Sequence, residues 1–337
     1  VGSEMCIRDS FSIVMLKIGV VGAGHLGKIH LKILKESSFI DLMGFYDIND
    51  DVSKQVTTSL DVKSFESLDD LIKVCDIVDI VTPTLSHYYC AQQAIVNGKH
   101  VFIEKPVTHT ISEVKNLIKL ANKHHVKAQV GHVERFNPAF KKASKEISKP
   151  KFIETHRLAQ FNPRGTDVSV VLDLMIHDLD ILLHVVNSPI KSIHASGVSV
   201  LSDTPDIANA RIEFLNGCVA NLTASRMSLK NMRKSRFFQK DSYISVDFLN
   251  KQFELICLEE LKEPEPFVPV IDLGPKGKKK VVMQTEKSSE TNPIEEELKS
   301  FVNSIHQNKS PEVDLLSAQK VLQLAIEISE QITVGQN

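Results

Sequence analysis

The stretch Lys17–Leu34, KIGVVGAGHLGKIHLKIL, decides the fold of this chain. Its first residues form an apolar run that is typical of a parallel strand buried on both faces. Three glycines follow with the spacing GxGxxG, and apolar residues then recur at helical intervals. Between a strand and a helix, this spacing predicts a dinucleotide-binding domain. The residues predicted to bind the cofactor in this loop are Gly22, Gly24, His25, Leu26 and Gly27.

Each glycine of the loop has a physical reason. Gly22 permits a tight turn, Gly24 lets a pyrophosphate approach the backbone, and Gly27 lets the helix pack closely on the strand. The N-terminus of the helix then faces the anion. An acidic residue is expected at the end of the second strand, and Ile40–Asp47 supplies it. Asp47 can bind the adenine ribose and repels a 2′-phosphate, which favours NAD over NADP; the alternative is a turn-forming aspartate.

Apolar strands and amphipathic helices alternate as far as residue 131. Further strands are expected at 62–65, 76–81, 100–103 and 126–131, and helices at 68–74, 86–97 and 111–125. This alternation predicts a doubly wound parallel sheet of six strands, in which ligands bind beyond the carboxyl ends. The candidate cofactor-binding residues at these ends are Thr82, Pro83, His87, Glu104 and Lys105.

The pattern changes in the second half of the chain. The sequence predicts a nucleotide-binding domain over residues 15–133. An α+β domain with an open, mainly antiparallel sheet is predicted over residues 134–337. Strand-like runs follow one another without helical crossovers here, and Asn216-Gly217 is a strong hairpin signal. We expect residues 1–14 to be a non-native leader. Helices are expected at 138–147, 293–307 and 315–332, and a surface loop at 261–280.

A predicted helix at 168–186, VSVVLDLMIHDLDILLHVV, is apolar nearly all round. At about 100° per residue, its residues Asp173, His177, Asp180 and His184 fall in one stripe roughly 60° wide. Burying carboxylates without partners is costly. The stripe therefore faces water, a ligand, or partners in a satisfied buried network.

The bulk composition is that of an ordinary globular protein. With 42% hydrophobic residues and a formal net charge of −2, the chain gives no electrostatic case for binding nucleic acid or a membrane surface. Its five cysteines form no CxxC pair, which favours reduced thiols in the cytoplasm. No apolar run approaches the roughly 20 residues of a membrane helix. No metal is expected, because His132 and Glu134 lack a third ligand.

Three motifs together resemble the Gfo/Idh/MocA oxidoreductases: the glycine loop, Glu104-Lys105-Pro106, and the pair Asp173 and His177. The resemblance runs from residue 15 onwards. Stretches at 161–184, 210–228 and 232–248 resemble the branch that oxidises C3 of UDP-N-acetylglucosamine ahead of an aminotransferase. The resemblance implies NAD as cofactor, a sugar-nucleotide substrate, and a homodimer or homotetramer formed through the open sheet. Only Gly165 remains of the glycine run that many members carry, so details of that loop are not transferred.

The resemblance also implies roles for the site residues. It places Lys105 and the face of Asp173 and His177 on opposite sides of the nicotinamide. Lys105 can stabilise negative charge on the reacting oxygen, and His177 is a candidate general base. Asp173 can orient the imidazole or bind a sugar hydroxyl. The sequence leaves open whether Lys105 or His177 takes the proton. The candidate substrate-binding residues are Lys105, Arg135, Asn137, Arg164, Asp173 and His177.

Two other functions stay open on the sequence alone. One is a dehydrogenase of inositol or a free sugar, with the same fold. The other is a non-catalytic regulator that senses NAD, although a regulator would not need Lys105, Asp173 and His177.

Overall fold

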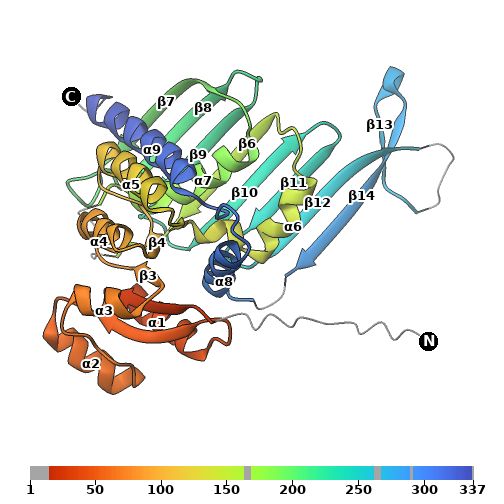
Figure 1. Cartoon of the computed structure of the whole chain (residues 1–337). Helices are drawn as coiled ribbons and strands as arrows, with labels where there is room; N and C mark the ends of the chain where they lie inside the picture. Colours follow the sequence, from red (N-terminus) through yellow and green to blue (C-terminus); the bar gives the residue numbers. More distant parts are fainter. Residues whose placement is uncertain (1–14, 163–167, 262–266, 289–290, 336–337) are drawn as a thin grey trace, which may run out of the picture.

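The computed structural model describes residues 15–162, 168–261, 267–288 and 291–335. They form a parallel sheet flanked by helices and a broad second sheet, which extends to the upper right in Figure 1. This arrangement confirms the predicted fold class, a Rossmann domain followed by an α+β domain. Among the described residues, no helix has both the length and the apolar character needed to cross a bilayer.

The first sheet has five parallel strands in the order β2-β1-β3-β4-β5. The strands are β1 Lys17–Val21, β2 Asp41–Tyr46, β3 Ile77–Ile80, β4 His100–Glu104 and β5 Ala128–Gly131. The helices are α1 His25–Glu36, α2 Asp50–Leu60, α3 Leu68–Val74, α4 Thr84–Val96 and α5 Ile111–His124. The strand order reverses between β1 and β3, which makes the carboxyl ends of these strands the expected ligand site.

Two features of this domain differ from the prediction. Residues 62–65 are not a strand, because Ser64 makes only an isolated bridge to Phe45; the described sheet therefore has five strands and not six. Helix α2 was not predicted from the sequence, because the acidic residues around its start are typical of a turn. In the structure, Asn49 caps α2 and two aspartates occupy its first turn, where they favour the positive end of the helix.

The second sheet has nine strands in the order β13-β14-β12-β11-β10-β6-β9-β8-β7. All neighbours are antiparallel except β6 and β9, which confirms the mainly antiparallel prediction. The strands are β6 Phe152–Leu158, β7 Ile190–Val198, β8 Ile207–Phe214, β9 Val219–Ser225, β10 Met232–Gln239, β11 Ser242–Asp247, β12 Gln252–Glu260, β13 Val270–Asp272 and β14 Lys278–Lys287.

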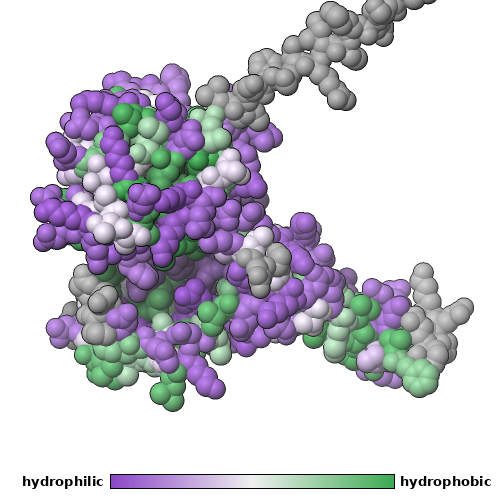
Figure 2. Space-filling view, turned by 90° about the horizontal axis from the view of Figure 1, so that it is seen from below, coloured by the Kyte–Doolittle hydropathy of each residue, from purple (hydrophilic) through white to green (hydrophobic). Residues whose placement is uncertain are grey.

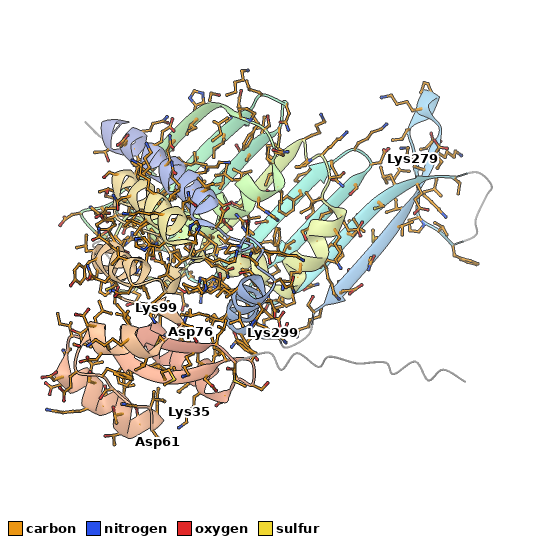
Figure 3. The ribbon with its side chains drawn as sticks, in the orientation of Figure 1. Lys35, Asp61, Asp76, Lys99, Lys279 and Lys299 are labelled. Atoms are coloured by element: carbon orange, nitrogen blue, oxygen red, sulfur yellow. The ribbon has the colours of Figure 1, made fainter. Side chains whose placement is uncertain are left out.

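The prediction of a surface loop at 261–280 is wrong, because this segment contains β13 and the start of β14. Charge pairing explains the difference: Glu259 and Glu260 of β12 lie opposite Lys280 and Lys279 of β14. These strands form an arm at the far edge of the sheet (Figure 1). Lys279, labelled in Figure 3, also pairs with Asp241 at 2.6 Å. Hydrophobic residues show along the arm in Figure 2.

The helix predicted at 168–186 is in two parts. A π-helical segment, η2 Val171–Met175, precedes α7 Ile176–Val185. Such segments are rare and are frequent at functional sites. Helices α6 Pro138–Glu146, α7 and α9 Leu315–Gly335 lie against one face of the second sheet (Figure 1).

The end of the chain completes the core of the Rossmann domain. Leu298 and Phe301 of α8 Pro293–His306 pack in one cluster with Ile18 of β1. The start of α9 packs on the opposite side of the sheet, while its later turns belong to the core of the second domain. Because one helix is buried against both domains, it fixes the carboxyl ends of the first sheet relative to η2 and α7.

Candidate functional site

The glycine loop has the geometry of a cofactor cradle. Gly22 has a φ of +95°, which L side chains rarely adopt. At Gly27 a Cβ would lie 2.1 Å from the Gly22 carbonyl oxygen, whereas at Gly24 nothing lies within 4 Å. The Asp47 carboxylate accepts a hydrogen bond of 2.7 Å from the backbone nitrogen of Ala23. The loop is thus tightly packed against α1 and open at Gly24, where an anion can approach.

A cleft runs beside this loop. It is lined by residues at the ends of β1, β2 and β3, among them Gly22, Asp47, Thr82 and Pro83, and by residues of α4 such as Tyr89. The Thr82 hydroxyl is buried and has no hydrogen-bond partner. An open anion cradle, a carboxylate at the end of β2 and an unpartnered hydroxyl fit NAD. These residues would hold its pyrophosphate and adenosine parts.

Lys105 crosses from the Rossmann domain to the second domain. Its Nζ donates a hydrogen bond of 2.8 Å to the main-chain carbonyl of Asp173, and it lies 3.5 Å from the Asp173 carboxylate. The accepting carbonyl belongs to the π-helical segment η2. The Asp173 side chain itself is 47% exposed. The structure therefore brings together Lys105 and Asp173, which lie in different domains of the sequence, and leaves the carboxylate open to a ligand.

His177 lies one turn after Asp173, at the start of α7. Its Nδ1 atom is buried and has no hydrogen-bond partner. Burial lowers the pKa of the imidazole well below 6.5, and the charges of Lys105 and Arg157 act in the same direction. His177 is therefore neutral near pH 7 and able to accept a proton.

Comparisons with known proteins identify the family of this chain. Residues 16–132 match the model of an oxidoreductase family with an NAD-binding Rossmann fold, and residues 142–240 match the GFO/IDH/MocA C-terminal domain. The chain belongs to the Gfo/Idh/MocA family. It is consequently an NAD-binding oxidoreductase, as predicted.

Individual members of the family differ in their similarity to this chain. The chain is 38% identical over 243 residues to UDP-N-acetylglucosamine 3-dehydrogenase from Acidithiobacillus ferrooxidans, covering 72% of this chain and 77% of that one. A solved structure of that protein has a TM-score of 0.85 at 32% identity and covers 95% of this chain and 98% of that chain. The chain is also 30% identical over 236 residues to scyllo-inositol 2-dehydrogenase from Bacillus subtilis, covering 63% and 68%.

Two residues predicted to contact the substrate bind other groups of the protein. Arg135 is buried and donates to both carboxylate oxygens of Asp180, at 2.7 and 2.6 Å. Asn137 is buried, caps α6, and donates to the main-chain carbonyl of Phe248 at 3.0 Å. These contacts and the burial of both side chains give no support to the two predicted substrate contacts, which stay predictions. Arg164 lies outside the described residues.

His87, which is predicted to bind the cofactor, is held by two main-chain carbonyls. Its two ring nitrogens lie 2.9 Å from the Pro106 carbonyl and 2.8 Å from the Thr82 carbonyl. The side chain is buried and is not part of the cleft lining. His87 therefore ties the loop after β3 to the loop that carries Lys105, so it positions cofactor-binding residues without facing the cleft.

The polar stripe of the helix divides along its length. Asp173 and His177 face the site, whereas Asp180 and His184 both contact Arg135. Asp178, outside the predicted stripe, pairs with the buried Arg157 at 2.8 Å. The satisfied-network alternative thus describes the second half of the stripe.

Glu104 belongs to a buried ionic cluster that the sequence did not predict. His30 of α1 lies between Asp79 of β3, at 2.8 Å, and Glu104, at 3.4 Å. Burial alone would lower the pKa of His30, but the charges and hydrogen bonds of the two carboxylates raise it to about 10. A Cβ at Gly131 would lie 2.7 Å from Glu104, so the glycine leaves room for this carboxylate. Glu104 is thus fixed directly before Lys105. The helical pattern around His30 gives no signal for this role.

In the described part of the chain, no three His, Cys, Asp or Glu side chains form a group that could hold a metal ion. Glu134, considered with His132 as a metal ligand, instead binds Arg157 at 2.9 Å.

Proposed function

We propose that this chain oxidises the C3 hydroxyl of UDP-N-acetylglucosamine to the 3-keto sugar. The observation that carries the proposal is the contact of Lys105 with Asp173, which lies one helical turn before the neutral His177. The 38% identity to a UDP-N-acetylglucosamine 3-dehydrogenase supports this substrate.

The residues of the site divide the work of alcohol oxidation. NAD, when bound, accepts the two electrons and the hydrogen that leave the carbinol carbon. We propose that Lys105 donates a hydrogen bond to the hydroxyl oxygen and stabilises its developing negative charge. We propose that the neutral His177 takes the hydroxyl proton, because its lowered pKa leaves the imidazole unprotonated near neutral pH. Asp173 would bind a neighbouring hydroxyl of the sugar through its exposed carboxylate. The carbonyl product then leaves as a keto sugar nucleotide.

A keto group on a sugar nucleotide is the substrate that an aminotransferase needs to install an amine. We therefore propose functional coupling to an aminotransferase, which would also draw an unfavourable oxidation forward by consuming the ketone.

Thermal unfolding of the purified chain with NAD tests the substrate. We expect UDP-N-acetylglucosamine with NAD to raise the melting temperature, because a ligand that binds only the folded state stabilises it. UDP-glucose and scyllo-inositol serve as comparison ligands. Stabilisation by scyllo-inositol but by no UDP-sugar would favour an inositol dehydrogenase and reject this proposal.

Turnover is measured in a second experiment. NADH absorbance is followed with UDP-N-acetylglucosamine, with and without an aminotransferase and glutamate to consume the ketone. We expect more NADH with the trap than without it. A chain that binds the UDP-sugar but forms no NADH under either condition would contradict a dehydrogenase.

A further inference from the structure

Arg233 is a half-exposed cation at the substrate side of the second sheet. It lies on β10, directly opposite Arg157 of β6 in the antiparallel register. Its side chain is 52% exposed, and its nearest carboxylate oxygen, on Glu134, is 3.9 Å away. That distance is too long for a hydrogen bond. Among the described residues, the Arg233 guanidinium donates no side-chain hydrogen bond that would compete with a ligand.

The neighbouring arginine is fully used. Arg157 donates to both oxygens of Asp178, at 2.8 and 3.1 Å, and to Glu134 at 2.9 Å. Glu134 therefore already has a closer cation than Arg233. Buried ion pairs with this geometry are expensive to break. Arg157 is thus a fixed part of the fold, and Arg233 is the member of the pair that is free to bind something else.

Arg233 lies near the start of α7, because it is opposite Arg157, which pairs at 2.8 Å with Asp178, the residue after His177. Its positive charge lowers the pKa of His177 and acts on Asp178. The positive charge of Lys105 also lowers the pKa of His177. The other arginines near this helix are occupied: Arg135 by Asp180, and Arg226 by contacts that include the main-chain carbonyl of Val168.

We propose that Arg233 binds a phosphate of the nucleotide-sugar diphosphate. This inference rests on the proposed function and deepens it, because it names the residue that distinguishes a sugar nucleotide from an uncharged sugar or inositol. A guanidinium is planar and presents paired donors that match a phosphate. A neutral polyol has no negative charge to pair with this exposed cation. A diphosphate has that charge, whereas the carboxylate of Glu134 lies too far from Arg233 to form a hydrogen bond.

The test compares Arg233→Gln with Arg233→Lys and with a matched control, Arg236→Gln. Arg236 lies on the same strand but on the opposite face, where it pairs with Glu154 at 3.0 Å. Affinities for UDP, for uridine and for NAD are measured by titration calorimetry, and steady-state kinetics are measured with UDP-N-acetylglucosamine.

We expect Arg233→Gln to weaken UDP binding about 10- to 100-fold, the range for a lost hydrogen bond to a charged group. KM should rise with a smaller change in kcat, and NAD affinity should stay the same. Arg233→Lys should fall between the wild type and the glutamine variant, because it keeps the charge and loses the paired donors. Uridine affinity and the Arg236→Gln variant should match the wild type.

The two proposals fail in different ways. A wild-type chain that does not bind UDP would reject the proposed substrate. A wild type that binds UDP, with Arg233→Gln binding it equally well, would reject the role of Arg233 alone. Equal losses for UDP and uridine would also reject it, since a phosphate contact cannot act on a nucleoside. If the glutamine variant does not fold, an undiminished UDP affinity of the lysine variant would overturn the inference.

Discussion

Lys105 is held by a main-chain carbonyl more closely than by a carboxylate. The distances from its Nζ are 2.8 Å to the Asp173 carbonyl and 3.5 Å to the Asp173 carboxylate. The backbone of η2 therefore fixes the ammonium group whatever side chain stands at position 173. This separates two roles that the sequence joins in one motif: residue 173 holds Lys105 through its backbone and meets the substrate through its side chain.

Substitutions at these two residues should differ accordingly. We expect Lys105→Ala to lower kcat by a factor of about 10² to 10⁴, the range for a positioned group that acts on a proton or oxygen in the transition state. Asp173→Asn should mainly raise KM, because the amide keeps the main-chain contact with Lys105. Lys119→Ala, an exposed lysine of α5, is the control and should retain wild-type rates. Steady-state NADH formation measures all three.

The pKa of His177 gives a pH dependence with a definite sign. Burial and neighbouring cations lower this pKa well below 6.5, so the imidazole stays unprotonated as the pH falls through 6.5. We expect kcat/KM to stay level through this region and to decline only at lower pH. Substituting Arg233 by Gln removes one of the cations, so the decline should then begin at a higher pH. A wild-type profile that falls with a midpoint of 6.5 or above would contradict the lowered pKa of His177.

At the scale of elements, the strand–turn–helix unit of β1 and α1 is the best-predicted part of the chain. The structure gives β1 the predicted residues, and α1 follows the glycine loop directly. Local signals suffice here, because the three glycines act through backbone geometry that depends on few other residues. By contrast, the π-helical segment η2 has no sequence signal, since its residues fit a regular helix equally well.

Gly24 and Gly27 offer a matched pair of alanine substitutions. Gly27→Ala would place a Cβ 2.1 Å from the Gly22 carbonyl, so we expect a large loss of stability or a failure to fold. Gly24→Ala has open space, so we expect near-normal unfolding with weakened NAD binding, because the methyl group occupies the approach of the pyrophosphate. Urea unfolding and NAD titration measure the two effects. Normal NAD affinity in Gly24→Ala would argue against pyrophosphate binding at this glycine.

At the scale of the whole molecule, the second sheet is covered unequally. Helices α6, α7 and α9 lie against one face (Figure 1). On the other face, Phe152, Phe238 and Tyr243 form a ring cluster with centroid distances of 5.8 and 5.1 Å. Phe238 is 37% exposed, and exposed hydrophobic residues continue on the arm. Exposed apolar side chains on this face favour contact with a partner.

We expect this face to join two or four copies of the chain. Light scattering after size-exclusion chromatography should give a mass of two or four chains, and Phe238→Glu should shift it to a smaller assembly by placing a charge in the apolar interface. Val96→Glu, an exposed position of α4 in the Rossmann domain, should leave the mass unchanged. A wild type that elutes as a single chain would overturn this prediction.

The sequence by itself determined the Rossmann domain, the NAD-binding loop, the open antiparallel sheet and the identities of Lys105, Asp173 and His177 as candidates. Each rests on local spacing: glycines at a turn, alternation along strands, and one helical turn between two polar residues. Only the tertiary structure decided which polar side chains are paired within the protein and which stay free to bind a ligand. Arg135, Asn137 and Arg157 have the same chemistry in sequence as substrate-binding residues, but burial makes each of them a partner of nearby groups. Arg233 stays available because its nearest carboxylate already has a closer cation. Burial and competition for partners are properties of the assembled domains, and spacing along the chain does not encode them.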